Sequence, residues 1–329
     1  MIYLIDYIRL NNLFFMSILV SGSLVFDNIM NFPDTFKRHI LPDQIHVLNV
    51  AFMVDRVEKS WGGTGGNIAY TLGLLGADPI LVSAVGKDGD DYLKYLNKVG
   101  VSTEYVLQDP TKLTAAAYIT TDEDDNQITA FYNGPLSLAG KVELAAVPMR
   151  PDLAIISPTA KEVMIKHMLD CKERGIKTVF DPGQQITAFS EAELKSMIDC
   201  AEFVIGNDYE MKLLEERTGW NGSEILKHTK YLITTLGERG SAVYTADGEQ
   251  VEAGVCPPLS FDDPTGAGDA YRAGFFAGFA KGMPLLVCAQ MGAVAASYAI
   301  ETYGTQAHTF TKAEFAVRYE KAFGSKIVI

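Results

Sequence analysis

Short apolar runs alternate with segments of helical periodicity along most of the chain. One such segment, "GNIAYTLGLLG", places Ile68, Leu72 and Leu75 on one helical face and ends at Gly76, a suitable residue for a helix end. Further helices are predicted at 91–100, at 161–174 and after Ser190, and buried strands at 17–22, 80–86, 152–157, 177–180 and 203–206. This alternation predicts a Rossmann-like three-layer α/β fold, in which helices cover both faces of a mainly parallel sheet.

Two stretches depart from this alternation. Residues 31–60 include "HVLNVAFMVDRVEKS", which is typical of extended chain without helix caps, and residues 112–134 predict two strands around the acidic turn "DEDDN". Both stretches lie close in sequence to the glycine-rich segment 62–66. We therefore expect 31–60 and 112–134 to form a small β-rich lid over the active-site end of the sheet.

The N-terminal end carries an apolar run, "LFFMSILV", that has two interpretations. It is too short to span a bilayer, and the leader before it has no basic cluster, which argues against a signal peptide. We expect the ordered fold to begin at Met16, with 1–15 as an extension without assigned function. Because no linker or repeat follows, 16–329 is predicted to be one domain that includes the lid.

Composition and charge exclude some partners. Forty-one acidic residues against 28 basic ones give a formal charge of −13, which disfavours a nucleic-acid partner. No pair of the four cysteines has C-x-x-C spacing, so reduced thiols in a cytoplasmic protein are expected, with no membrane partner. A small anionic ligand stays possible, since backbone amides can bind one locally.

The stretch "DDPTGAGDAYRAGF" carries the strongest candidate chemistry. Successive amides of Gly266, Ala267 and Gly268 at a helix N-terminus would form an anion-binding nest. Asp269 follows at once and could accept a proton from a hydroxyl that attacks a phosphoryl group held in the nest. The alternative is that Asp269 only complements the helix dipole, and these residues alone leave both interpretations open.

Three other segments have structural and functional interpretations. "GGTGGN" (62–67) could admit a ligand against bare backbone or be a tight turn. "NDYE" (207–210) is a capping-box arrangement, and "TTLGERGSAVY" could be an ordinary hairpin. No GxxxxGK[ST] motif is present, so a P-loop is excluded, and no GxGxxG follows the first strand, which disfavours a dinucleotide oxidoreductase.

Taken together, these motifs resemble the PfkB/ribokinase family of sugar and nucleoside kinases. "GGTGGNIAYTLGLLG" and "DPTGAGDAYRAGF" are similar to its N- and C-terminal signatures, "NDYE" to its N-x-x-E motif and "TLGERG" to its T-x-G-x-x-G motif. The motifs occur in the family's order, and the resemblance runs from about Met16 to the end. It implies a ribokinase-like fold and an ATP-dependent kinase.

The resemblance also implies roles for single residues. Asp269 would be the general base and the amides of 266–268 the anion hole. Asn207 and Glu210 would organise Mg²⁺ through its waters, and Thr235, Gly237 and Gly240 would line the ATP site. Asp27, placed at the exit of the first strand, would bind two sugar hydroxyls with Gly63 and Asn67. Asp263 and Thr265 would hold a K⁺ ion, with carbonyls from 301–305.

"GSLVFDNI", "DPGQQ" and "DNQITAFYNG" resemble bacterial adenosine kinases in particular. The resemblance implies that Ser23, Gln184 and Gln185 approach a nucleoside and that Phe131 stacks on its purine. Asn133 stands where a proline is familiar in those enzymes. The leading hypothesis is phosphorylation of the adenosine 5′-hydroxyl to AMP, in purine salvage. Alternatives are a kinase of ribose or another furanose and a non-catalytic nucleoside sensor. The lid is also the candidate surface for a homodimer.

Overall fold

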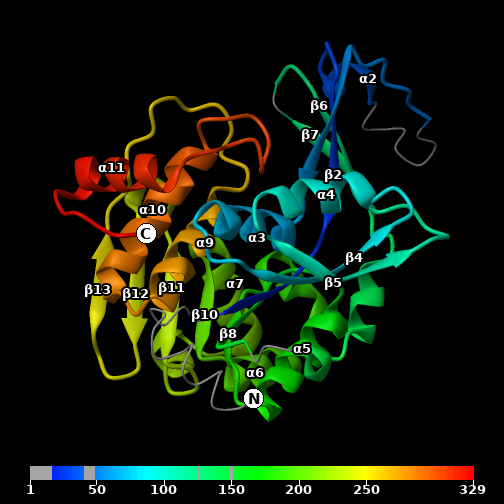
Figure 1. Ribbon diagram of the computed structural model, residues 1–329. Coiled ribbons are helices and arrows are strands. Elements are labelled where there is room, and N and C mark those ends of the chain that lie inside the picture. The colour runs from blue at the N-terminus through cyan, green and yellow to red at the C-terminus, as the bar shows by residue number, and fades with distance from the viewer. Residues whose placement is uncertain (1–16, 41–48, 125, 148–150) are drawn as a thin grey trace.

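The computed structural model describes residues 17–40, 49–124, 126–147 and 151–329. The predicted extension 1–15, the expected start at Met16, part of the first lid stretch (41–48) and Asp125 of the acidic turn lie outside the described residues. Within them, one large sheet has the order β13-β12-β11-β10-β9-β8-β1-β4-β5 (Figure 1). Its strands are β13 (Gln250–Ala253), β12 (Ser241–Thr245), β11 (Tyr231–Thr235), β10 (Phe203–Asn207), β9 (Lys177–Phe180), β8 (Leu153–Ile156), β1 (Ile18–Ser21), β4 (Ile80–Gly86) and β5 (Ser102–Asp109).

Neighbouring strands from β11 to β5 are parallel, and β12 and β13 extend one edge in antiparallel pairing. The predicted strands at 17–22, 80–86, 152–157, 177–180 and 203–206 all lie in this sheet. The mainly parallel sheet predicted from the alternation is therefore confirmed. Its parallel strands end together at one edge, where ligands bind in open α/β sheets.

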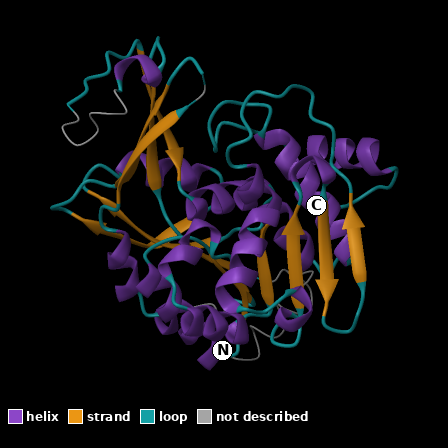
Figure 2. Ribbon diagram, turned by 180° about the vertical axis from the view of Figure 1, so that it is seen from behind, coloured by secondary structure: helices purple, strands orange, loops and turns teal. Residues whose placement is uncertain are grey.

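Helices cover both faces of the sheet, as Figure 2 shows. Alternate residues of β1 point to opposite faces: Ile18 and Val20 belong to one buried cluster, and Leu19 belongs to the other. The first face carries α3 (Thr64–Leu74), α4 (Asp90–Lys98), α9 (Ala267–Ala280), α10 (Leu285–Ala299) and α11 (Lys312–Phe323). The second carries α5 (Lys161–Glu173), α6 (Glu191–Cys200), α7 (Asp208–Thr218) and α8 (Gly222–Ile225).

Helices α9 and α10 pack closely because α9 has glycine on the contact face. A Cβ at Gly274 would lie 2.4 Å from the carbonyl oxygen of Met291, too close for any other residue. Gly278 also faces α10, at Cys288. Gly282 follows the helix end at Ala280 and adopts a φ of +69°. The close packing at Gly274 and Gly278 fixes the position of α9, the helix that begins at the "GAG" segment.

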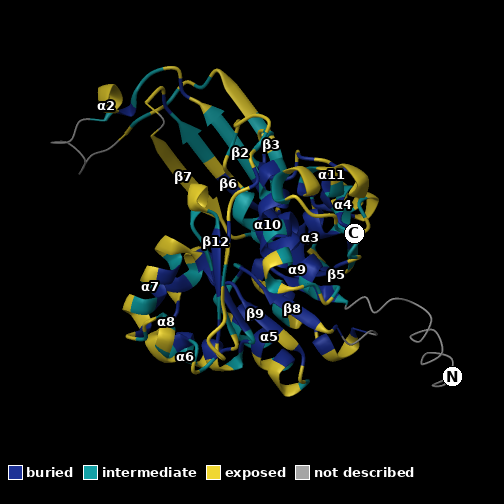
Figure 3. Ribbon diagram, turned by 90° about the vertical axis from the view of Figure 1, so that its left-hand side faces the viewer, coloured by how far each residue is buried: buried dark blue, intermediate teal, exposed yellow. Residues whose placement is uncertain are grey.

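A second sheet, with the order β3-β2-β6-β7, stands apart from the large one (upper right in Figure 1). Its strands are β3 (Arg56–Gly62), β2 (Val25–Asn31), β6 (Ala115–Thr121) and β7 (Gln127–Tyr132), with the short helix α2 (Phe36–His39) after β2. The strand pair predicted within 112–134 is present, and Asp122 organises its turn by accepting from the amides of Asp124 and Asn126. Figure 3 shows this sheet as much more exposed than the core.

The second sheet corrects one placement. It begins at Val25, before the predicted boundary at residue 31, so Asp27 lies on strand β2 of this sheet and not at the exit of the first core strand. The apolar run that contains β1 is short, and the chain turns at Gly22 and Ser23 into a new strand. A sequence pattern alone does not show that one extended stretch is divided between two sheets.

The part of the chain that the structure describes also has four short 3₁₀ helices, η2 (Leu136–Lys141), η3 (Leu144–Ala146), η4 (Gly183–Ala188) and η5 (Gly237–Arg239). All four cysteines are unpaired, as the sequence predicts. Among the described residues, the longest apolar helices fall short of what crossing a membrane requires.

Candidate active site

A cavity of about 1140 Å³ lies between the carboxyl ends of the parallel strands and the second sheet. Residues that follow β1, β8, β9, β10 and β11 line its core side, and β2 and β7 line the opposite side. Most of the predicted site residues meet here: Ser23, Asp27, Gly63, Asn67, Phe131, Gln184, Gln185, Asn207, Glu210, Thr235, Gly237, Thr265, Gly266, Gly268 and Asp269. Three predicted residues, Ala267, Gly240 and Asp263, do not line the cavity.

The start of α9 forms one end of the cavity. Gly266 precedes the helix with a φ of +84° and a ψ of −6°, a left-handed conformation that favours glycine. The amide of Ala267 donates to the Pro264 carbonyl at 3.2 Å, which closes the turn. Gly266 and Gly268 line the cavity, whereas Ala267 does not and its amide is engaged within the loop, so the anion hole stays a prediction with two of its three residues at the cavity.

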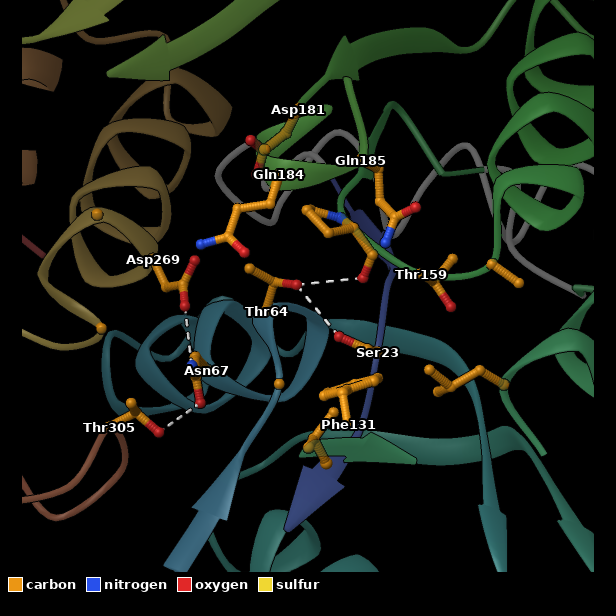
Figure 4. Close-up of a pocket in the computed structure, with 18 of the residues that line it drawn as sticks. Ser23, Thr64, Asn67, Phe131, Thr159, Asp181, Gln184, Gln185, Asp269 and Thr305 are labelled. Carbon is orange, nitrogen blue, oxygen red and sulfur yellow. Dashed lines mark hydrogen bonds between the residues drawn. The ribbon is translucent and has the colours of Figure 1, made fainter. Parts of the chain in front are cut away.

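Asp269 sits in the first turn of α9 and is half-buried. Asn67 of α3 donates from Nδ2 to Asp269 Oδ2 at 2.8 Å (Figure 4). Burial raises the pKa of Asp269 to about 7, while the nearby Arg272 cation and the Asn67 hydrogen bond oppose that rise. A carboxylate with a pKa near neutrality is suited to accept a proton from a hydroxyl.

The orientation of the Asn67 amide is fixed by its other neighbours. Gln306 donates from Nε2 to Asn67 Oδ1 at 2.9 Å, and the Thr305 hydroxyl lies 2.9 Å from the same oxygen. Gln306 Nε2 also contacts the Tyr92 hydroxyl, which donates to the carbonyl of residue 62 at 2.7 Å. The Thr305 hydroxyl lies equally close to the Trp61 carbonyl oxygen, at 2.9 Å, so Gln306 is the donor that fixes the orientation. Because an amide oxygen only accepts, this donor obliges the Nδ2 group of Asn67 to face Asp269.

A buried arginine that the sequence analysis did not select lies one helical turn after Asp269. Arg272 pairs with both carboxylate oxygens of Asp181, Nε to Oδ2 at 2.6 Å and Nη2 to Oδ1 at 2.7 Å. Its Nη1 donates to the Gly268 carbonyl at 3.0 Å, and Nη2 lies 3.7 Å from Glu210 Oε2. An available signal was the charged residue in an otherwise apolar helix, "AYRAGFF", which requires a partner when buried.

Asn207 and Glu210 form the capping box of α7. The Glu210 amide donates to Asn207 Oδ1, and Glu210 Oε2 accepts from the Asn207 amide, both at 2.8 Å. Both residues also line the cavity, so the capping box is confirmed and the magnesium role stays a prediction. Glu210 Oε1 has no partner among the described residues, which fits a carboxylate that binds metal-held water. The described residues hold no group of three or more His, Cys, Asp or Glu able to bind a metal without further ligands.

The predicted nucleotide residues divide into two kinds. Thr235 ends β11, and Gly237 begins η5; both line the cavity. Gly240 lies outside it, and a Cβ there would stand 2.0 Å from the Ala253 carbonyl oxygen. Gly240 is thus required by the β12–β13 backbone rather than by contact with the cavity.

The predicted K⁺ residues lie in the loop before α9. Asp263 accepts from the Thr265 amide at 2.9 Å and from the Gly304 amide at 3.2 Å. It thus ties the start of α9 to the 301–305 loop that the resemblance associates with it. Thr265 is exposed and lines the cavity.

The opposite end of the cavity lies between the second sheet and the loops after β8 and β9. Phe131 projects into it from β7 with 54% of its surface exposed (Figure 4). Asp27 on β2 is partly buried, and this burial, with Asp263 nearby, raises its pKa to about 6. Thr159, another residue that the sequence analysis missed, is 3% exposed, and its hydroxyl has no partner among the described residues.

Ser23 also belongs to this region. Its hydroxyl lies 3.2 Å from that of Thr64, which in turn donates to the Pro158 carbonyl. Thr64 lines the cavity as well, but the sequence analysis does not select it as a site residue, because it lies within the "GGTGGN" segment.

Comparisons with known proteins show which sequences and structures this chain resembles. Over 275 residues the chain is 30% identical to the nucleoside kinase of Methanocaldococcus jannaschii, covering 83% of this chain and 90% of that protein. The solved structure of Burkholderia thailandensis nucleoside kinase in complex with inosine has a TM-score of 0.85 and 34% identity, covering 94% and 99% of the two chains. The same enzyme in complex with ADP-inosine has a TM-score of 0.83 and 36% identity, covering 94% and 97%.

The structure of the Methanocaldococcus jannaschii enzyme, described as an archaeal member of the ribokinase family, has a TM-score of 0.80 and 28% identity, covering 93% and 99%. The ribokinase-like fold is therefore confirmed. Residues 25–312 match the family described as pfkB family carbohydrate kinase. This match covers most of the chain, so the protein belongs to the pfkB family of carbohydrate kinases.

Proposed function

We propose that the protein transfers the γ-phosphoryl group of ATP to the 5′-hydroxyl of purine nucleosides, converting adenosine to AMP. The observation that carries this proposal is the Asp269 carboxylate at the cavity end of α9, beside Gly266 and Gly268. In the reaction, Asp269 accepts the 5′-hydroxyl proton as the oxygen forms its bond to Pγ. The bond from Pγ to the bridging oxygen breaks, and ADP leaves. Amides at a helix N-terminus suit the charge on the transferred group.

A nucleoside suits this cavity better than a free sugar. Asp27 and Asn67 offer groups for sugar hydroxyls, but the cavity continues past them to Phe131, which would give a base an aromatic face. The unpartnered Thr159 hydroxyl lies on the core side of the cavity. It can both donate and accept, as can the amides of Gln184 and Gln185, so these groups suit 6-amino and 6-oxo purines alike. The Burkholderia thailandensis relative in complex with inosine supports the same class.

Two cations belong to the proposal. Bound Mg²⁺ would neutralise phosphate charge, and Asn207 and Glu210 would hold its waters. A K⁺ ion beside the loop before α9 would involve Asp263 and Thr265. Turnover in K⁺ should therefore exceed turnover in a large organic cation, and equal rates would remove the K⁺ site from the proposal.

A homodimer through the second sheet is also part of the proposal. Tyr118, Ile128 and Tyr132 are exposed apolar side chains there, and β7 is an edge strand. Sedimentation analysis of the wild type and of Ile128→Lys should show a dimer that the substitution weakens. A monomeric wild type would contradict this assembly.

The function is tested by ADP release with adenosine, inosine, ribose and fructose as acceptors, with the product identified by mass. Adenosine and inosine should be phosphorylated at the 5′ position and the sugars poorly. Asp269→Asn should lose about 10²–10⁴ in rate while it still binds the nucleoside. Asp262→Asn, an exposed aspartate in the same loop, is the matched control and should retain activity. Preferred turnover of a sugar would overturn the proposal, and nucleoside binding without turnover would identify a sensor.

A further inference from the structure

Arg272 is a charged side chain in the buried interior of α9. It is 6% exposed, and its neighbours Ala270, Tyr271 and Ala273 are buried as well. Removing a guanidinium from water is costly unless hydrogen bonds and opposite charge compensate it. Asp181 supplies this compensation through two contacts of 2.6 and 2.7 Å. This pairing explains how the charge is tolerated, but not why a cation lies at this point.

The contacts of Arg272 join three elements that serve different parts of the site. The Gly268 carbonyl, 3.0 Å from Nη1, belongs to the first turn of α9, which carries the predicted base. Asp181 follows β9 directly and lies two residues before η4, which contains the predicted nucleoside residues 184 and 185. Glu210, 3.7 Å from Nη2, lies in the first turn of α7 and is the predicted magnesium residue. One guanidinium therefore contacts three parts of the cavity wall: the part that carries the predicted general base, the part that leads to the predicted nucleoside residues, and the part that carries the predicted magnesium residue.

The same cation acts on the charge of Asp269. Carboxylates of Asp181 and Glu210 face Asp269 from the loop after β9 and from α7, and they raise its pKa together with burial. Among the described residues, Tyr92 of α4 also interacts with Asp269, and burial raises the pKa of Tyr92 so that it is neutral. The Arg272 cation lowers the pKa of Asp269 and so opposes the effects of burial and of the two carboxylates. Lys161, the other cationic side chain among the described residues that line the cavity, is paired with Glu193 at 3.2 Å.

We propose that Arg272 is a positioning residue: it holds the first turn of α9, and with it Asp269 and Gly268, in register with the 181–185 loop and Glu210. This role rests on the proposed function. The two-point contact of Arg272 with Asp181 requires arginine, because a lysine ammonium cannot bind both oxygens of Asp181 and the Gly268 carbonyl at once. Its charge keeps Asp269 available as a base. The two contributions can be separated by substitution.

Arg272→Lys retains the charge and loses the geometry. We expect kcat to fall about tenfold, the KM for adenosine to change little, and the acid limb of the pH–rate profile to stay in place. Arg272→Met alone would leave Asp181 buried without a partner and could prevent folding. The combination Arg272→Met with Asp181→Asn removes both charges. It should fold with a Tm near that of the wild type, while kcat falls about a hundredfold and the acid limb moves to higher pH.

A matched control removes an ion pair outside the cavity. Lys166→Met with Asp170→Asn breaks a half-buried pair of 2.7 Å on α5 and should leave kcat and the pH profile unchanged. If Arg272 only stabilised the fold, the double variant at Arg272 and Asp181 would have wild-type kcat and an unmoved acid limb. That result would overturn the inference.

A second readout does not depend on nucleoside turnover. The Tm gain from adding Asp269→Asn should increase between about pH 5 and pH 8, and it should increase more in the Arg272→Met, Asp181→Asn background than in the wild type. The reason is that Arg272 lowers the pKa of Asp269 more than Asp181 raises it, so loss of both charges raises this pKa further. An equal increase in both backgrounds would show that the Arg272–Asp181 pair has no net effect on the Asp269 pKa, and would overturn this part of the inference. If the wild type phosphorylates no nucleoside, the proposed function fails, while this measurement still decides the coupling.

Discussion

Asn67 and Asp269 are 202 positions apart in sequence, and the Asn67 amide donates to the Asp269 carboxylate at 2.8 Å. The contact joins α3 to α9, and each of these helices begins within a glycine-rich segment. Its direction is set by Gln306, which donates to the oxygen of the Asn67 amide. The predicted base is therefore held in place by an amide whose orientation is itself fixed.

The pH dependence of activity should report the state of Asp269. Burial raises the pKa of Asp269 to about 7, and only the ionised form accepts a proton. We expect kcat/KM for adenosine to fall as the pH drops through about 7. Because the proposed K⁺ and Mg²⁺ would also affect the rate, the profile is measured at saturating concentrations of both. A profile that is flat from pH 5 to 8 would show that Asp269 is not the base.

The same group makes a prediction about stability. The folded pKa of Asp269 lies above its ordinary value of 3.8, so its contribution to stability is present below about pH 4 and is lost as the pH rises through about 7. Asp269→Asn removes this loss. Its Tm relative to the wild type should therefore rise between pH 5 and pH 8, as thermal unfolding would show. A difference that stays constant across this range would mean that Asp269 is not perturbed in the folded protein.

Gln306→Glu tests the fixed orientation of Asn67. The introduced carboxylate cannot donate to Asn67 Oδ1, so the Asn67 amide should turn and present its oxygen to Asp269. The pKa of Asp269 would rise, and the acid limb of the pH–rate profile should move to higher pH. Gln290→Glu on α10 is the matched control, because Gln290 accepts a hydrogen bond from Tyr319 through Oε1, as a glutamate also can. Unmoved profiles for both variants would contradict the role given to Gln306.

Phe131→Ala tests stacking on the base. Base–aromatic stacking is worth about 1–3 kcal/mol, so kcat/KM for adenosine should fall roughly ten- to a hundredfold. Any activity on ribose should change much less, since ribose has no base. Tyr132→Ala is the control, because Tyr132 is the exposed neighbour on β7 and does not line the cavity. Equal losses on adenosine and ribose would show that Phe131 supports the second sheet as a whole.

Thr159→Val removes a buried hydroxyl that has no partner among the described residues. Burying a polar group without a hydrogen bond is unfavourable, so the Tm should stay the same or rise. If the hydroxyl binds the nucleoside, the KM for adenosine should rise about tenfold. Thr178→Val gives the opposite pattern, a lower Tm with unchanged KM, because the Thr178 hydroxyl donates to the Cys200 carbonyl outside the cavity. An unchanged KM in Thr159→Val would place the nucleoside elsewhere.

The sequence by itself determined many of the core elements, their order, and where the main candidate residues lie on them. Apolar periodicity predicted the strands β1, β4, β8, β9 and β10 and the helices α3, α4, α5 and α6, but not β5, α10 or α11. The "GAGD" segment predicted a loop that enters α9 at Asp269. These features are local: turn conformation, capping and a helix N-terminus depend on residues a few positions apart. Parallel strands then bring their carboxyl ends to one edge, which is why most of the predicted site residues line one cavity.

Only the tertiary structure decided how distant side chains pair. Arg272 and Asp181 are 91 positions apart, and Gln306 and Asn67 are 239 apart. Each pair depends on which helix packs on which strand end, and no local period encodes that. The same holds for Asp27, whose strand belongs to the second sheet because β2 pairs with β3 and β6 rather than with β1. Sheet membership is set by backbone hydrogen bonds between strands, and these form only once the chain has folded.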